Sequence, residues 1–147
     1  MPASKKTGRR GSSAQLIEHL LKERGQLLAL LLRLFSDVKA EKLDTQDKDL
    51  LEEFCQVLVD YIAAGHFGLY ERISGGKERR LELAGLAKKI YPQIENTTQF
   101  ALEFTEKYNA ENRTGKSGNL AGELSRLGEA LTVRIELEDK LIAKMLA

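Results

Sequence analysis

The stretch that decides the fold is residues 53–73, which read EFCQVLVDYIAAGHFGLYERI. Large apolar side chains return in it every three or four residues, the spacing that places side chains on one face of an α-helix. With about 100° per residue and Asp60 at zero, they fall between roughly 100° and 220°. This spacing predicts a long amphipathic helix with one face in a core. The apolar stripe consists of Leu51, Phe54, Leu58, Tyr61, Ile62, Gly65, Leu69 and Ile73.

The rest of the chain shows the same helical period. Helices are expected over residues 13–37, 44–73, 78–109 and 120–145, and no segment has the two-residue alternation of a strand. Turn and loop residues follow at Gly75 and Gly76 and over residues 109–119. Helices of this length with short connections favour an all-α fold, an antiparallel up-and-down four-helix bundle.

Pro92 lies inside the third expected helix. Proline lacks a backbone N–H, and its ring clashes with the preceding helical turn. We therefore expect this helix to be kinked or split near Ile90 and Tyr91.

Length and composition limit the class of protein. A chain of 147 residues has the length of one domain, which we expect over residues 13–147. Cys55 is the single cysteine and cannot form an intramolecular disulfide, which fits the cytoplasm. The longest apolar run, residues 27–32, is far shorter than the roughly 20 residues of a membrane span, and no signal-peptide core follows the basic start. We expect a cytoplasmic protein without a membrane segment.

The formal net charge of +1 hides an uneven distribution. Residues 1–12 contain four basic residues and no acid, and we expect them to be a disordered basic tail. Residues 44–72 contain seven acids and two bases, and 2 − 7 gives −5. The folded part thus lacks the basic patch of a nucleic-acid-binding protein, and specific DNA binding is not expected. The acidic helix favours a basic protein partner, and a solvated acidic face is the alternative.

The sequence contains no convincing catalytic or metal-binding set. The two histidines lack the Glu three residues earlier that di-metal bundles use, because Leu16 and Ala63 stand there. Cys55 and His66 would lie about 16 Å apart along one helix, too far to act together. Residues 115–117 read GKS but lack the first glycine and the strand of a phosphate-binding loop. We expect no enzymatic activity, no metal and no cofactor.

Phe67 lies on the face of the central helix opposite the apolar stripe. On the same helical wheel Ala63, Phe67, Asp60 and Glu71 fall between roughly 300° and 20°. Two interpretations are open. In a central helix, Phe67 and the nearby Gly65 and Gly68 would meet a second neighbouring helix. Alternatively, an aromatic side chain flanked by carboxylates forms a protein-binding hot spot.

Residues 60–73, DYIAAGHFGLYERI, resemble the central motif of the bacterial Rsd/AlgQ family, regulators of the primary sigma factor. Residues 89–100, KIYPQIENTTQF, and residues 128–142, GEALTVRIELEDKLI, resemble the same family. The chain departs from the family pattern at Ala63, where relatives carry a hydroxyl side chain. It also departs at Leu20 and Tyr91, where tryptophan is usual.

This resemblance implies a helical anti-sigma factor. Such proteins bind the C-terminal, promoter-recognising domain of the primary sigma factor. They occlude its contacts with promoter DNA and core RNA polymerase in stationary phase. By position, the binding-surface Asp and Phe of the family fall on Asp60 and Phe67. The implied partner-binding residues are Asp60, Ala63, His66, Phe67, Tyr70 and Glu71.

A different class of function uses the same surface. In this alternative the protein is a helical adaptor that regulates a metabolic enzyme or a phosphocarrier protein. In either case we expect a monomer, with a weak homodimer as the other possibility.

Overall fold

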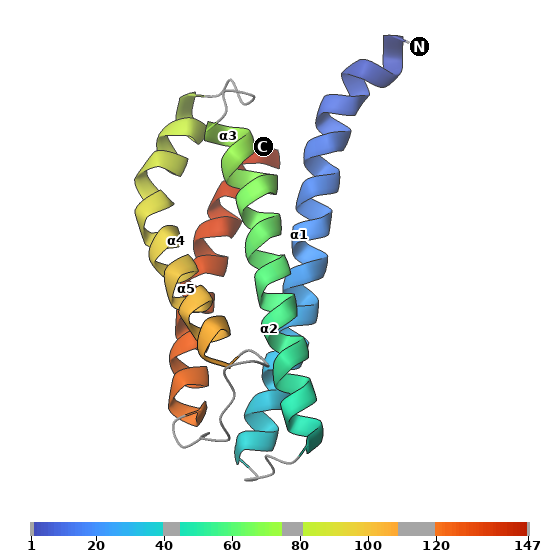
Figure 1. Ribbon diagram of the computed structural model, residues 1–147. Coiled ribbons are helices and arrows are strands. Elements are labelled where there is room, and N and C mark those ends of the chain that lie inside the picture. Colours follow the sequence, from blue (N-terminus) through green and yellow to red (C-terminus); the bar gives the residue numbers. More distant parts are fainter. Residues whose placement is uncertain (1, 40–44, 75–80, 109–119, 147) are drawn as a thin grey trace.

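The computed structural model describes residues 2–39, 45–74, 81–108 and 120–146 (Figure 1). These residues form helices and contain no strand, which confirms the all-α prediction. The turn expected at Gly75 and Gly76 and the loop expected over residues 109–119 lie outside them. The elements are α1 (Pro2–Lys39), α2 (Thr45–Gly65), the π-helical turn η1 (His66–Tyr70), α3 (Glu71–Ser74), α4 (Leu81–Tyr108) and α5 (Leu120–Leu146).

The long helices α1, α2, α4 and α5 run up and down beside one another (Figure 1). Around the bundle α1 packs on α2, α2 on α4, α4 on α5 and α5 on α1. This arrangement confirms the predicted antiparallel four-helix bundle. Each leucine that it buries contributes roughly 1.5–3 kcal/mol. Fully buried side chains include Leu20, Leu27 and Leu34 of α1, Phe54, Leu58 and Tyr61 of α2, Leu83 of α4, and Leu124, Leu127 and Leu141 of α5.

The first helix begins earlier than the sequence predicts. The structure has α1 from Pro2, so helix covers the segment expected to be a disordered tail. Lysine, arginine and alanine in this segment are compatible with a helix. In Figure 1 the first turns of α1 extend beyond the other helices, so the bundle does not surround them.

The third predicted helix is α4, and it is not split. Pro92 lies inside the continuous helix Leu81–Tyr108, and its side chain is exposed. An exposed ring can be accommodated at the cost of one backbone hydrogen bond and a bend. Figure 1 shows α4 bowed along its length, and the split expected near Ile90 and Tyr91 is not present.

All eight residues of the predicted apolar stripe are buried, which confirms the orientation of α2. The predicted single helix over residues 44–73 nevertheless contains a π-helical turn. Such a turn adds one residue to the helix and rotates everything after it by about one position, or roughly 100°. This rotation changes which side chains of the motif reach the surface.

Candidate protein-binding surface

Phe67 is exposed at the outer side of η1. Its side chain is 62% accessible to solvent, although it belongs to the most apolar residue types. His66 beside it is also exposed, and the two rings meet edge to face with centroids 4.9 Å apart. Phe67 therefore does not meet a second helix of the described bundle, which excludes the first interpretation for this side chain. The two glycines, by contrast, do lie against neighbouring helices.

Carboxylates flank Phe67 along the same helix. Asp60 and Glu71 are exposed, and Ala63 is half-buried between them. The amide Nε2 of Gln56 donates a hydrogen bond to Oδ1 of Asp60 over 3.2 Å, which leaves the carboxylate accessible to a partner. We define the Phe67 surface as Asp60, Ala63, His66, Phe67 and Glu71.

Tyr70 is buried, unlike the other residues of the expected binding set. On an uninterrupted helix it falls at roughly 280°, near the margin of the binding face, and the extra residue of η1 moves it to roughly 180°, inside the apolar stripe. Its ring packs against that of Tyr91 with centroids 5.6 Å apart. Burial raises the pKa of its hydroxyl. Tyr70 thus lies beneath the Phe67 surface rather than on it.

Two glycines allow close packing at the π-helical turn. A Cβ at Gly65 would lie 3.0 Å from Oε2 of Glu138 and 3.1 Å from Nη2 of Arg134. A Cβ at Gly68 would lie 3.6 Å from Cβ of Leu16, an ordinary van der Waals distance. Gly65 is therefore the glycine that its surroundings require, because larger residues would displace a buried ion pair.

That ion pair is the centre of a polar network in the core. Glu138 of α5 is fully buried, and Arg134 one turn earlier is almost fully buried. Nε of Arg134 donates to Oε2 of Glu138 over 3.0 Å, and Nη2 of Arg24 in α1 donates to Oε1 over 3.1 Å. The hydroxyl of Tyr61 in α2 donates to the same Oε1. Glu138 thus binds donors from three helices.

Arg134 and Arg24 extend the network outward. Nη1 of Arg134 donates to Oγ1 of Thr98 in α4 over 2.6 Å, and its guanidinium lies over the Tyr61 ring, 5.5 Å from the centroid. Nη1 of Arg24 donates to Oδ1 of Asp139 over 2.7 Å. Burial and the charge of Glu138 raise the pKa of Tyr61 well above its usual range, so Tyr61 remains a donor. The network connects all four long helices directly beneath α2.

The sequence matches the family described as "Regulator of RNA polymerase sigma(70) subunit, Rsd/AlgQ" over residues 2–146. The chain belongs to the Rsd/AlgQ family. A "Regulator of sigma D" from Enterobacter sp. (strain 638) is 39% identical over 141 residues, covering 93% of this chain and 84% of the relative. One from Yersinia enterocolitica is 35% identical over 143 residues, covering 92% and 83%. No solved structure matches the chain.

Membership of the Rsd/AlgQ family confirms the expectation of a regulatory protein rather than an enzyme. Within the described residues no three His, Cys, Asp or Glu side chains gather as metal ligands, and Cys55 is buried. None of the described helices is long and apolar enough to cross a membrane.

The polar network of this Rsd/AlgQ protein is not predicted from its sequence. One signal for it exists, because Glu138 follows Leu131 by seven residues and precedes Leu141 by three, which puts a charge on an apolar stripe. A charge in that position needs a buried partner. Its partners Arg24 and Tyr61 are distant in sequence, so periodicity within one helix does not reveal them.

Proposed function

We propose that this protein is an anti-sigma factor that binds the C-terminal promoter-recognition domain of the primary sigma factor through the Phe67 surface. The observation that carries the proposal is the exposed Phe67 between the carboxylates of Asp60 and Glu71. The family to which the chain belongs, described as regulators of the RNA polymerase sigma(70) subunit, and its relatives described as regulators of sigma D support a sigma factor as the partner.

Charge and shape give this surface a mechanism. A promoter-recognition domain binds DNA phosphates and therefore presents basic side chains. Asp60 and Glu71 would attract such a surface, and Phe67 would fill an apolar pocket at the centre of the interface. A monomer bound there covers groups that the sigma domain needs for promoter DNA and core RNA polymerase. This occlusion would act in the cytoplasm during stationary phase.

Phe67→Ala is expected to weaken binding of the purified sigma C-terminal domain by at least about tenfold, because truncating a central aromatic residue removes a hot spot. Isothermal titration calorimetry measures the effect. Leu102→Ala is the matched control, since Leu102 is another exposed apolar residue, 44% accessible, on α4. Wild-type affinity of a folded Phe67→Ala variant would contradict the proposed site.

If the protein acts by occlusion, it should compete with promoter DNA for the sigma domain. Promoter DNA bound to the sigma domain should be displaced when this protein is added, with no ternary complex in a gel-shift assay. A stable ternary complex would argue against occlusion while leaving the binding site intact.

Salt is expected to slow association. Exposed carboxylates steer a basic partner over distances comparable to the Debye length, about 10 Å at 0.1 M salt. Raising salt from about 0.05 to 0.3 M should therefore reduce the association rate several-fold and change the dissociation rate less. Surface plasmon resonance separates the two rates. Asp60→Asn should reduce the dependence of the association rate on salt. An association rate that does not change with salt would show that the acidic residues do not steer the partner.

A further inference from the structure

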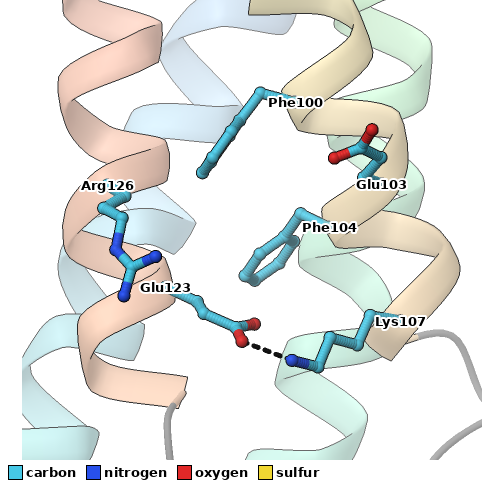
Figure 2. A pocket seen from close by; sticks show the side chains of 6 residues that line it. All are labelled: Phe100, Glu103, Phe104, Lys107, Glu123 and Arg126. Atoms are coloured by element: carbon cyan, nitrogen blue, oxygen red, sulfur yellow. Dashed lines mark hydrogen bonds and ion pairs between the residues drawn. The ribbon is translucent and has the colours of Figure 1, made fainter.

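A second candidate site lies between α4 and α5. It is a pocket of about 210 Å³ lined by Phe100, Glu103, Phe104, Lys107, Glu123 and Arg126 (Figure 2). These residues belong to the last turns of α4 and the first turns of α5, which lie at the end of the bundle away from α3 (Figure 1). The pocket is therefore separate from the Phe67 surface.

Two phenyl rings form the apolar part of this pocket. Phe104 is only 4% exposed, and its ring meets the edge of Phe54 with centroids 6.0 Å apart, so the core holds it in place. Phe100 is half-buried, and in Figure 2 both rings point from α4 toward α5. An apolar, flat ligand can pack against such rings in an offset or edge-to-face arrangement.

The Lys107–Glu123 ion pair closes one end of the pocket (Figure 2). Burial raises the pKa of Glu123, but hydrogen bonds from Lys107 and Tyr108 outweigh it and hold the pKa below its usual value. The carboxylate of Glu123 is thus charged and already satisfied by its neighbours. It leaves little attraction for a cationic ligand.

Arg126 of α5 places a positive charge on the side of the pocket formed by α5. It is exposed, its charge helps to lower the pKa of Glu123 one turn earlier, and no acidic side chain in the described part of the chain lies within 4.0 Å of it as an ion pair. In Figure 2 its side chain lies across the pocket from the two rings, whereas Glu103 lies on the α4 side. A guanidinium in this position can bind a carboxylate through two parallel hydrogen bonds.

We propose that this pocket binds a small aromatic carboxylate, with its ring against Phe100 and Phe104 and its carboxylate on the guanidinium of Arg126. The volume is below the roughly 300 Å³ at which drug-sized sites begin, which favours one ring with a short side chain. Because the pocket and the Phe67 surface lie apart, the ligand and a sigma factor can bind together. The proposal does not depend on the proposed function.

Titration of the ¹⁵N-labelled full chain with phenylacetate tests this site. We expect amide shifts confined to residues around Phe100, Phe104 and Arg126, with a Kd of about 1 mM, as suits a ligand of this size. Phenethylamine, which has the same ring and the opposite charge, and propionate, which lacks the ring, should bind at least about tenfold more weakly.

Two variants decide the role of the charge. Arg126→Gln should weaken phenylacetate binding by at least about tenfold, because it removes the charge-assisted hydrogen bonds. Glu103→Gln should leave binding unchanged or slightly stronger. Absence of shifts at 10 mM phenylacetate, equal binding of phenethylamine, or unchanged affinity of Arg126→Gln would each overturn the proposal.

Discussion

Glu138→Ala is expected to lower the free energy of unfolding by about 3–5 kcal/mol, the usual cost of removing one partner of a buried ion pair. The substitution leaves the guanidinium of Arg134 almost fully buried without its carboxylate and removes the acceptor of the Tyr61 hydroxyl. Arg24 keeps Asp139 and loses one of its two acidic partners. The loss is comparable to a large part of the total stability of a domain of this size.

Urea unfolding followed by circular dichroism measures this loss as a shift of the midpoint at constant slope. Glu82→Ala is the control, because Glu82 forms an ion pair with Lys144 at the surface, 3.0 Å between Oε2 and Nζ. We expect no measurable change for that variant, since exposed ion pairs contribute little. Equal effects of the two substitutions would show that burial of the network does not matter.

A double replacement separates the value of the network from the cost of breaking it. Glu138→Leu combined with Arg134→Leu removes both charges, and such apolar replacements of buried pairs are often neutral or stabilising. The double variant is therefore expected to be more stable than Glu138→Ala. Arg24 and Tyr61 would then lack a shared acceptor, so full recovery is not expected.

The features that sequence predicts here are those set by a single helix. The apolar stripe of α2 depends on the spacing of its own residues, and so does the position of Phe67 on the opposite face; that no helix covers this face is known only from the structure. The helix ends near Leu120 and Tyr108 follow in the same way from local composition. Local spacing therefore placed Asp60, Ala63, Phe67 and Glu71 on one accessible or half-buried face, whereas His66 and Tyr70 joined the expected set through the resemblance to the family.

The features that sequence missed depend on contacts between helices. The π-helical turn lies where Gly65 of α2 meets Glu138 and Arg134 of α5, and where Gly68 meets Leu16 of α1. A helical wheel assumes constant rotation per residue, so it cannot contain an inserted residue. That assumption alone places Tyr70 near the surface, whereas the structure buries it.

Gly65→Ala is the second substitution with a large expected effect. The new methyl group would lie 3.0 Å from Oε2 of Glu138 and 3.1 Å from Nη2 of Arg134, tighter than most real Cβ contacts, so these side chains would have to shift. These side chains cannot easily retreat, because Tyr61 and Arg24 hold Glu138 from other helices. We expect a loss of about 2–3 kcal/mol in the free energy of unfolding, in the range of overpacked cores.

Gly68→Ala is the matched control for this substitution, because it lies in the same turn and changes the chain by the same methyl group. Its Cβ would lie 3.6 Å from Cβ of Leu16 and 3.7 Å from the carbonyl oxygen of Leu16, both ordinary van der Waals contacts. Alanine also removes the backbone entropy cost of glycine, about 1 kcal/mol in a regular helix. The free energy of unfolding of Gly68→Ala should therefore equal or exceed that of the wild type.

The two glycine variants also test how the interior and the surface are connected. Relief of the clash at Gly65 requires either that Glu138 and Arg134 move or that the helix rotates at η1, and rotation would redirect Phe67 and displace Tyr70 from Tyr91. Gly65→Ala is thus expected to shift the aromatic NMR signals of Tyr70 and Tyr91 and to weaken sigma-domain binding, while Gly68→Ala preserves both. If Gly65→Ala lost stability but kept wild-type binding and ring signals, the network would stabilise the bundle without positioning Phe67.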